Sequence, residues 1–103
     1  MSEYLDGVRR YAPDAPEETV EAIVKYLGIA LHNRDSSLVS CSDPNELARV
    51  RDNFCRKKLG LEQAVADHAI EEVCRQMSED RTKHRVTFYY LVAEKSGTLA
   101  KLT

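Results

Sequence analysis

The chain has 103 residues, of which 43% are hydrophobic and 31% are charged, and its formal net charge at pH 7 is −2. These values are typical of one globular domain, here 1–103, and they exclude a disordered tail. The small net charge gives no general electrostatic case for binding nucleic acid or an anionic membrane, and no apolar run is long enough to span a bilayer. The first residues lack the basic and apolar regions of a signal peptide, so we expect a cytoplasmic protein.

Hydrophobic residues at helical spacing predict a first helix near residues 2–12 and a second near residues 16–33. Ser2 is a suitable N-cap for the first helix, which is too short to be stable unless it packs on the others. The Asp-Ala-Pro-Glu sequence from Asp14 is a good start for the second helix, because it offers a capping acceptor and then a proline. Gly28 interrupts this helix at a cost of about 1 kcal/mol relative to alanine, which indicates close approach of another helix.

A polar loop is expected over residues 34–43, where serines and an aspartate break the helical period. Asp43 is followed by a proline and then by an acid, so it should cap a third helix near residues 44–59. Gly60 then ends this helix in the left-handed conformation, with basic residues at the negative end of the helix dipole. The buried stripe of the third helix is predicted to be Leu47, Val50 and Phe54.

The remaining sequence predicts a fourth helix near residues 62–78 and a fifth near residues 81–96, capped by Asp80 and closed at Gly97. The side chains expected to face inward from the fourth helix are Val65, Ala66, Ala69, Ile70, Val73 and Met77. Two leucines in the tail after Gly97 can pack back on the core. The sequence therefore predicts an all-α fold, a compact single-domain bundle of about five helices.

The most apolar run of the chain extends from Val86 to Ala93. As a helix it is apolar nearly all round, which is typical of a buried helix. Its β-branched and aromatic residues are also typical of a strand, but the chain offers no partner strand, so we expect a helix. The side formed by Phe88, Leu91 and Val92 exceeds what one small core requires. Either the first two helices wrap this run, or a second copy of the chain shares it as a partner surface.

The three cysteines, Cys41, Cys55 and Cys74, are widely spaced and form no Cys-x-x-Cys pair. In a reducing cytoplasm we expect three free thiols, two of them small apolar fillers on helices. Cys41 is the best placed to react, because it precedes a helix amino terminus, where the dipole lowers a thiol pKa. Nucleophilic catalysis would also need a histidine such as His32 to lie beside it. The spacing of the cysteines and histidines does not indicate a metal site, and no cofactor is expected.

The segment Asp35-Ser36-Ser37-Leu38 is similar to the Asp-Ser-Leu motif at which acyl carrier proteins bear phosphopantetheine. A carrier needs an exposed serine at the start of an acidic helix, whereas the next helix here is rich in arginine and lysine. The alternative is that the hydroxyls of Ser36 and Ser37 bond loop backbone groups. With Cys41, these loop residues are the candidate site for a small molecule or an acyl group.

The third helix is the most basic element, with Arg49, Arg51, Arg56, Lys57 and Lys58. Asp52 lies between Arg49 and Arg56 on the outer face, which is the pattern of a solvated face with ion pairs, so nucleic acid is a weaker hypothesis. Arg51 adjoins the apolar stripe. We predict that its stem is buried and that its guanidinium anchors an acid or carbonyl groups of the loop from Asp35 to Asp43.

Three segments carry a family resemblance, namely RDSSLVSCSDP (34–44), ELARVRDNF (46–54) and RVTFYYL (85–91). Through them the chain resembles, over residues 4–97, a family of small uncharacterised bacterial proteins that is common in alphaproteobacteria, a domain of unknown function. The resemblance implies a compact all-helical domain. It implies no activity, and no functional residue is carried over from it.

The leading functional hypothesis is a non-enzymatic cytoplasmic helical module that acts through protein contacts, either with a partner protein or as a homodimer. An alternative is a small-molecule or acyl-group binding protein, or an enzyme, that uses the loop. Its candidate ligand-binding residues are Asp35, Ser36, Ser37, Cys41 and Arg51. A second alternative is nucleic-acid binding through the third helix. No catalytic residue, cofactor, metal or membrane contact is predicted.

Overall fold

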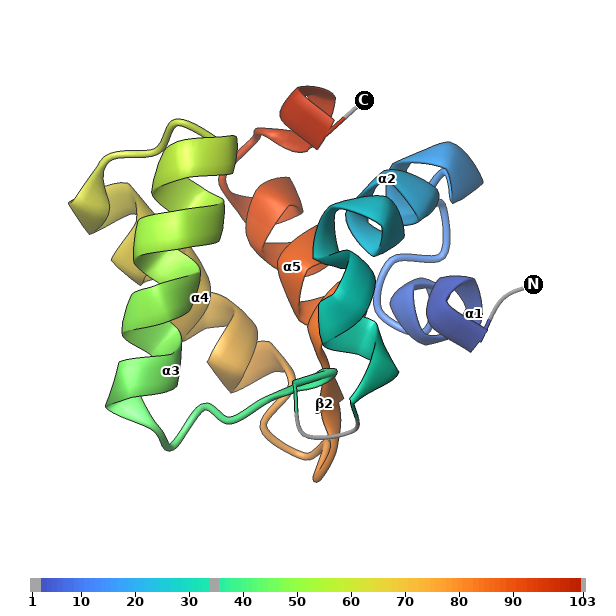
Figure 1. Ribbon diagram of the computed structural model, residues 1–103, viewed down its shortest axis with the longest axis horizontal. Helices are drawn as coiled ribbons and strands as arrows, with labels where there is room; N and C mark the ends of the chain where they lie inside the picture. The colour runs from blue at the N-terminus through green and yellow to red at the C-terminus, as the bar shows by residue number, and fades with distance from the viewer. Residues whose placement is uncertain (1–2, 34–35, 103) are drawn as a thin grey trace.

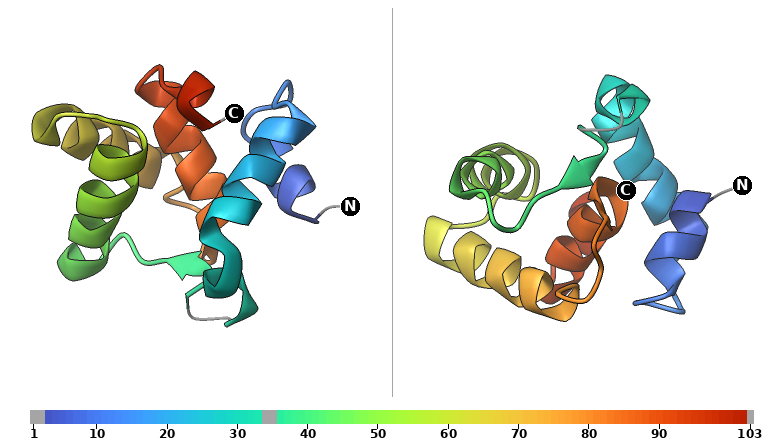
Figure 2. Two further views of the ribbon diagram at one scale, coloured as in Figure 1. Left: turned by 45° about the horizontal axis from the view of Figure 1, so that its top comes forward. Right: turned by 90° about the horizontal axis from the view of Figure 1, so that it is seen from below.

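Helix α5 runs through the middle of the molecule, and the other elements pack around it (Figures 1 and 2). The computed structural model describes residues 3–33 and 36–102. On one side of α5 (Arg85–Lys95) lie α1 (Glu3–Arg9), α2 (Glu17–Leu27) and the 3₁₀ helix η1 (Gly28–His32). On the other side lie α3 (Pro44–Arg49), the π-helical segment η2 (Val50–Lys58) and α4 (Gln63–Gln76). A second 3₁₀ helix, η3 (Leu99–Leu102), follows α5, and the prediction of an all-α fold with about five helices is confirmed.

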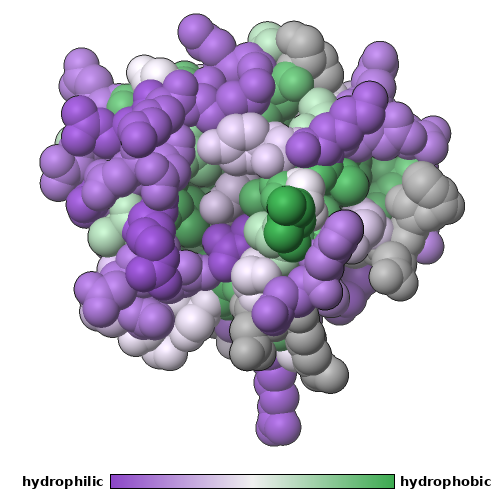
Figure 3. Space-filling model, viewed as in Figure 1, coloured by the Kyte–Doolittle hydropathy of each residue, from purple (hydrophilic) through white to green (hydrophobic). Residues whose placement is uncertain are grey.

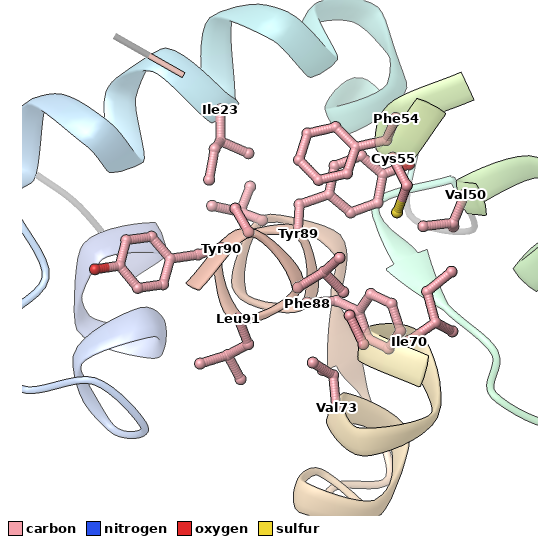
Figure 4. Close-up of a cluster of buried hydrophobic side chains, with 14 of the residues drawn as sticks. Ile23, Val50, Phe54, Cys55, Ile70, Val73, Phe88, Tyr89, Tyr90 and Leu91 are labelled. Carbon is pink, nitrogen blue, oxygen red and sulfur yellow. The ribbon is translucent and has the colours of Figure 1, made fainter. Parts of the chain in front are cut away.

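The run from Arg85 to Ala93 is buried at every position. Figure 4 shows its side chains meeting residues of three neighbouring elements, among them Ile23 of α2 and Val73 of α4. The ring of Tyr89 stacks on that of Phe54 in η2 at a centroid distance of 4.1 Å. The predicted central helix is therefore confirmed, and the alternative strand is wrong.

The surrounding helices wrap α5 completely, so the central run is not a partner surface. Phe88, Leu91 and Val92 are each 0% exposed. The contacts that bury α5 come from both sides of the molecule, with α1 and α2 on one side and α4 on the other. The expectation that a second copy shares this side of the helix is wrong.

A two-stranded antiparallel sheet precedes α5 and delays its start. It pairs β1 (Leu38–Val39) with β2 (Lys83–His84). The helix predicted from residue 81 consequently begins at Arg85. Asp80 does not cap it as predicted, because the Asp80 carboxylate instead accepts a hydrogen bond from the hydroxyl of Tyr11.

The helix predicted over residues 16–33 stops at Leu27, because Gly28 adopts a positive φ of 49°. A Cβ built at Gly28 would meet no atom within 4 Å, so the expected close approach of another helix is wrong. The glycine is needed for its backbone conformation, which lets its N–H bond the carbonyl of Val24 while the chain turns into η1. The start of α2 also differs from prediction, since Pro16 rather than Asp14 occupies the cap position.

The third helix has the predicted limits but changes its winding at Val50, where the α-helix α3 becomes the π-helix η2. Asp43 caps it as predicted, with its carboxylate accepting from the N–H of Asn45 at 3.0 Å. Gly60, with a φ of 71°, follows its last turn, and the N–H of Leu61 bonds the carbonyl of Cys55 at 2.9 Å. The longer π repeat matches the spacing of the fully buried residues, which are Val50, Phe54, Cys55 and Leu59.

The fourth helix is α4, and five of its six predicted inward residues are buried. Val65 is the exception, since its side chain is 45% exposed. Gly97 ends α5 as predicted, and Leu102 of η3 packs back on the core. The predicted cap at Ser2 lies outside the described residues. Within the described part of the chain, every helix is too short or too polar to cross a membrane.

Candidate functional site

The loop from Ser36 to Asp43 crosses between the two halves of the molecule, from η1 to the start of α3 (Figures 1 and 2). Its strand β1 pairs with β2, so that Leu38 lies opposite His84 and Val39 opposite Lys83. The side chain of Val39 is buried in the core. The described part of the loop is therefore an ordered part of the fold.

Arg85 anchors the first half of this loop through its guanidinium. Its Nε donates to the carbonyl of Ser36 at 2.6 Å, and its Nη2 donates to the carbonyl of Leu38 at 3.0 Å. The same guanidinium forms an ion pair with Glu46 in the first turn of α3 and donates to the Tyr89 hydroxyl at 3.2 Å. Arg85 is only 9% exposed, so this charge is desolvated and depends on its partners.

The guanidinium stays charged despite its burial. Burial by itself lowers the pKa of Arg85, but the Tyr89 hydroxyl and the Glu46 carboxylate raise that pKa above its ordinary value. Burial also raises the pKa of the Tyr89 hydroxyl. Arg85 therefore acts as a permanent cation that joins loop, α3 and α5.

The predicted anchoring of the loop by Arg51 is wrong, because Arg85 has that role, whereas the predicted burial of the Arg51 stem agrees with a side chain that is only 24% exposed. The guanidinium of Arg51 bonds Asp52 at 2.9 Å and approaches Asp67 of α4 at 3.5 Å, rather than reaching the loop. The hydrogen bond from Arg51 is the main cause that lowers the pKa of Asp52. One feature of the sequence could have indicated the role of Arg85. It is a charged residue at the start of an otherwise apolar helix, where a guanidinium must find buried acceptors.

Cys41 and Cys74 form a disulfide, with a Cα–Cα distance of 5.8 Å. The prediction of three free thiols is therefore wrong for two of them. The disulfide joins the second half of the loop to α4 across 33 residues of sequence. Sequence spacing alone cannot reveal such a contact, because it depends on how the loop and α4 meet in the fold.

Cys55 remains a free thiol, as predicted, and is 0% exposed within the core. Burial raises its pKa to about 12, so it is an inert apolar filler. Cys41, the cysteine that the sequence places best for reaction, is oxidised in this structure. Among the described residues, no group of three or more histidine, cysteine, aspartate or glutamate side chains is arranged to hold a metal ion.

The hydroxyl of Ser36 bonds backbone carbonyl groups in and just after η1. Ser36 Oγ donates to the carbonyl of Ala30 at 2.5 Å and to that of Asn33 at 3.2 Å. Ser37 uses its backbone carbonyl to accept from the N–H of Arg85 at 2.8 Å. Neither serine begins a helix, because α3 starts at Pro44, so the geometry of an acyl carrier is not present. The first residue of that motif, Asp35, lies outside the described residues.

Two open surface hollows flank the disulfide, and both Cys41 and Cys74 line each of them. The larger, of about 620 Å³, lies between the loop and the turn before β2. Its polar side chains are Ser40, Ser42, Ser78, Arg81, Thr82 and Lys83, and the described residues that line it include no aspartate or glutamate. We call it the basic hollow. The second, of about 490 Å³, lies between α3, η2 and α4.

A family model for a protein of unknown function matches residues 3–100, which include the loop, both cysteines of the disulfide and α5. The chain belongs to the DUF2853 family. The resemblance identified from the three sequence segments is thereby confirmed. Comparison with curated proteins finds no match, so the function of this DUF2853 chain has to be argued from its own residues.

Part of the positive charge of the third helix of this DUF2853 chain is neutralised by acids of the same helix and of α4. Arg49 pairs with Glu46 at 3.2 Å, and Arg51 pairs with two aspartates. The ammonium of Lys58 lies over the ring of Tyr26, 5.7 Å from its centroid. Nucleic-acid binding therefore gains no support from a free cationic face on this helix.

Proposed function

We propose that this chain is a non-enzymatic cytoplasmic interaction module that pairs with a second copy through the end of α2 and η1. One observation carries the proposal: Ile29 of η1 is 83% exposed, and Tyr26, one turn earlier, is 43% exposed. In the view of Figure 3, which is that of Figure 1, hydrophobic surface is visible near the centre of the molecule, among hydrophilic side chains. Covering an isoleucine side chain is worth about 1.5–3 kcal/mol, so a partner that buries this pair of residues gains free energy. We call Tyr26 and Ile29 the η1 patch.

Tyr26 is held in place before any partner arrives. Its ring packs against Phe54 at a centroid distance of 5.6 Å, and Lys58 lies over the ring. A fixed aromatic side chain loses little conformational freedom on binding, which is the property of residues that contribute most to interfaces. The η1 patch thus combines a rigid anchor with an exposed aliphatic side chain.

The charges beside the η1 patch favour a second copy as the partner. Glu18 and Glu21 are exposed near the start of α2, and Lys25 is exposed near its end. These three residues recur at helical spacing and therefore share one stripe. Antiparallel pairing of two α2 helices about a two-fold axis between Glu21 and Lys25 would set the acidic end of each against the basic end of the other, and would lay the η1 patch of each copy on the start of α2 in its partner. The surface is therefore complementary to itself.

Light scattering on size-exclusion fractions tests self-association, with the substitution Ile29→Glu. We expect the unmodified chain to dimerise at high micromolar concentration and Ile29→Glu to weaken dimerisation about tenfold or more, because it buries a charge in the interface. Val65→Glu is the matched control, since Val65 is 45% exposed on α4. It should leave dimerisation unchanged. A strictly monomeric unmodified chain, or equal effects of the two substitutions, would contradict the proposal.

A further inference from the structure

We propose that the Cys41–Cys74 disulfide is a thiol-exchange site for small anionic thiols that bind in the basic hollow. This inference is independent of self-association through the η1 patch. The disulfide is accessible to an attacking thiol, because neither cysteine is in the buried core and both line the two hollows. The fully buried Cys55 provides the contrast within the same chain. A structural disulfide in a core would not be open to an attacking thiolate from two sides.

The charge of the basic hollow selects the thiol. Arg81 is exposed at its edge, and the ammonium of Lys83 is fixed by donating to the carbonyl of Asp80 at 2.7 Å. Three serines contribute hydroxyl groups to the same hollow, and no carboxylate among the described lining residues opposes an anion. A carboxylate-bearing thiol such as glutathione is therefore concentrated beside the disulfide, whereas a neutral thiol is not.

The exchange is a balanced two-step reaction. A thiolate attacks one sulfur of the disulfide, the Cys41–Cys74 bond breaks, and a mixed disulfide forms while the other cysteine leaves as a thiolate. A second molecule of the same thiol attacks the mixed disulfide and leaves as the symmetrical disulfide, releasing the second cysteine. Two electrons pass from two small thiols to the protein disulfide, and each released thiolate takes up a proton from water according to its pKa.

The fold is built to keep its shape when this bond opens. Arg85 continues to hold the carbonyl groups of Ser36 and Leu38, and β1 remains paired with β2. Only the second half of the loop, around Cys41, loses its covalent link to α4. Exchange is therefore a local and reversible modification of the native protein. In the cytoplasm, where we place the chain, such accessible disulfides are typically transient.

The test follows the mixed disulfide by intact-mass spectrometry after acid quenching of the oxidised chain treated with reduced glutathione or with neutral β-mercaptoethanol. We expect a glutathione adduct on Cys41 or Cys74 while circular dichroism remains native. Arg81→Glu should slow the glutathione reaction about fivefold or more and leave the β-mercaptoethanol rate within about twofold, because only the anionic thiol depends on attraction. Lys83→Gln should have the same selectivity with a smaller effect.

The matched control is Lys57→Glu with Lys101→Glu, two exposed lysines that do not line the basic hollow. This double variant lowers the net charge by four, whereas Arg81→Glu lowers it by two and Lys83→Gln by one, yet it should leave both rates unchanged. An NMR titration with S-methylglutathione, which cannot exchange, measures binding in the basic hollow separately from the exchange reaction. A disulfide that resists both thiols until the chain unfolds would overturn the exchange. Equal slowing of both thiols by Arg81→Glu would overturn the anionic selectivity.

Discussion

Arg85 is a charged residue at the first position of a helix whose next eight residues are also buried. Its cost in desolvation is offset by the Glu46 carboxylate, the Tyr89 hydroxyl and two loop carbonyls. The sequence pattern predicted an arginine anchor for the loop but placed it at Arg51 instead of Arg85. Helical periodicity placed Arg51 beside the apolar stripe but could not show that Asp52 and Asp67 of α4 lie nearer to its guanidinium than the loop does.

Removing the guanidinium of Arg85 should be far more costly than removing a surface guanidinium with the same partner. Arg85→Met removes the buried cationic partner of Glu46 and the side-chain donor to two loop carbonyls, so we expect the free energy of unfolding to fall by about 3–5 kcal/mol. Arg49→Met is the matched control, because Arg49 also pairs with Glu46 but its side chain is 64% exposed. It should cost less than about 1 kcal/mol. Urea denaturation measures both values, and similar losses would show that the Arg85 cluster is not a buried anchor.

At the scale of elements, the apolar periods placed all five helices, and the caps at Asp43, Gly60 and Gly97 were correctly identified. These features are local, so a sequence pattern is enough to predict them. The two-stranded sheet was not predicted, because its strands are more than 40 residues apart in the sequence and each has only two residues, too few to show a period. Gly28 was recognised as unusual but was explained by packing instead of by its positive φ.

The change in the free energy of unfolding caused by Gly28→Ala has opposite signs under these two explanations of Gly28. In a continuous helix, Gly28→Ala would raise the free energy of unfolding by about 1 kcal/mol, because alanine is the better helix former. At a φ of 49° and ψ of −116°, alanine is instead strained, so we expect a loss of about 1–3 kcal/mol. Thermal and urea unfolding of the variant decide the question. A stabilised variant would contradict the break between α2 and η1.

At the scale of the whole molecule, the loop from Ser36 to Asp43 is fastened to both halves of the fold. Arg85 ties it to α5 and α3, and the disulfide ties it to α4. Closing 33 residues with a disulfide is worth about 3–4 kcal/mol in the chain-entropy account, comparable to the Arg85 cluster. The site could not be predicted in full from the sequence, because both attachments join residues far apart in the chain. The basic hollow lies between the loop so fastened and the turn before β2.

The pairing of Cys41 with Cys74 is the feature on which the site and its proposed chemistry both depend. The chain is purified without reductant, treated with iodoacetamide at pH 8 in the native state, digested, and mapped by mass spectrometry. We predict one disulfide-linked peptide pair containing Cys41 and Cys74, and a Cys55 that is alkylated only after denaturation, because burial raises its pKa to about 12. Alkylated Cys41 and Cys74 in the native protein, or a link that includes Cys55, would contradict the account.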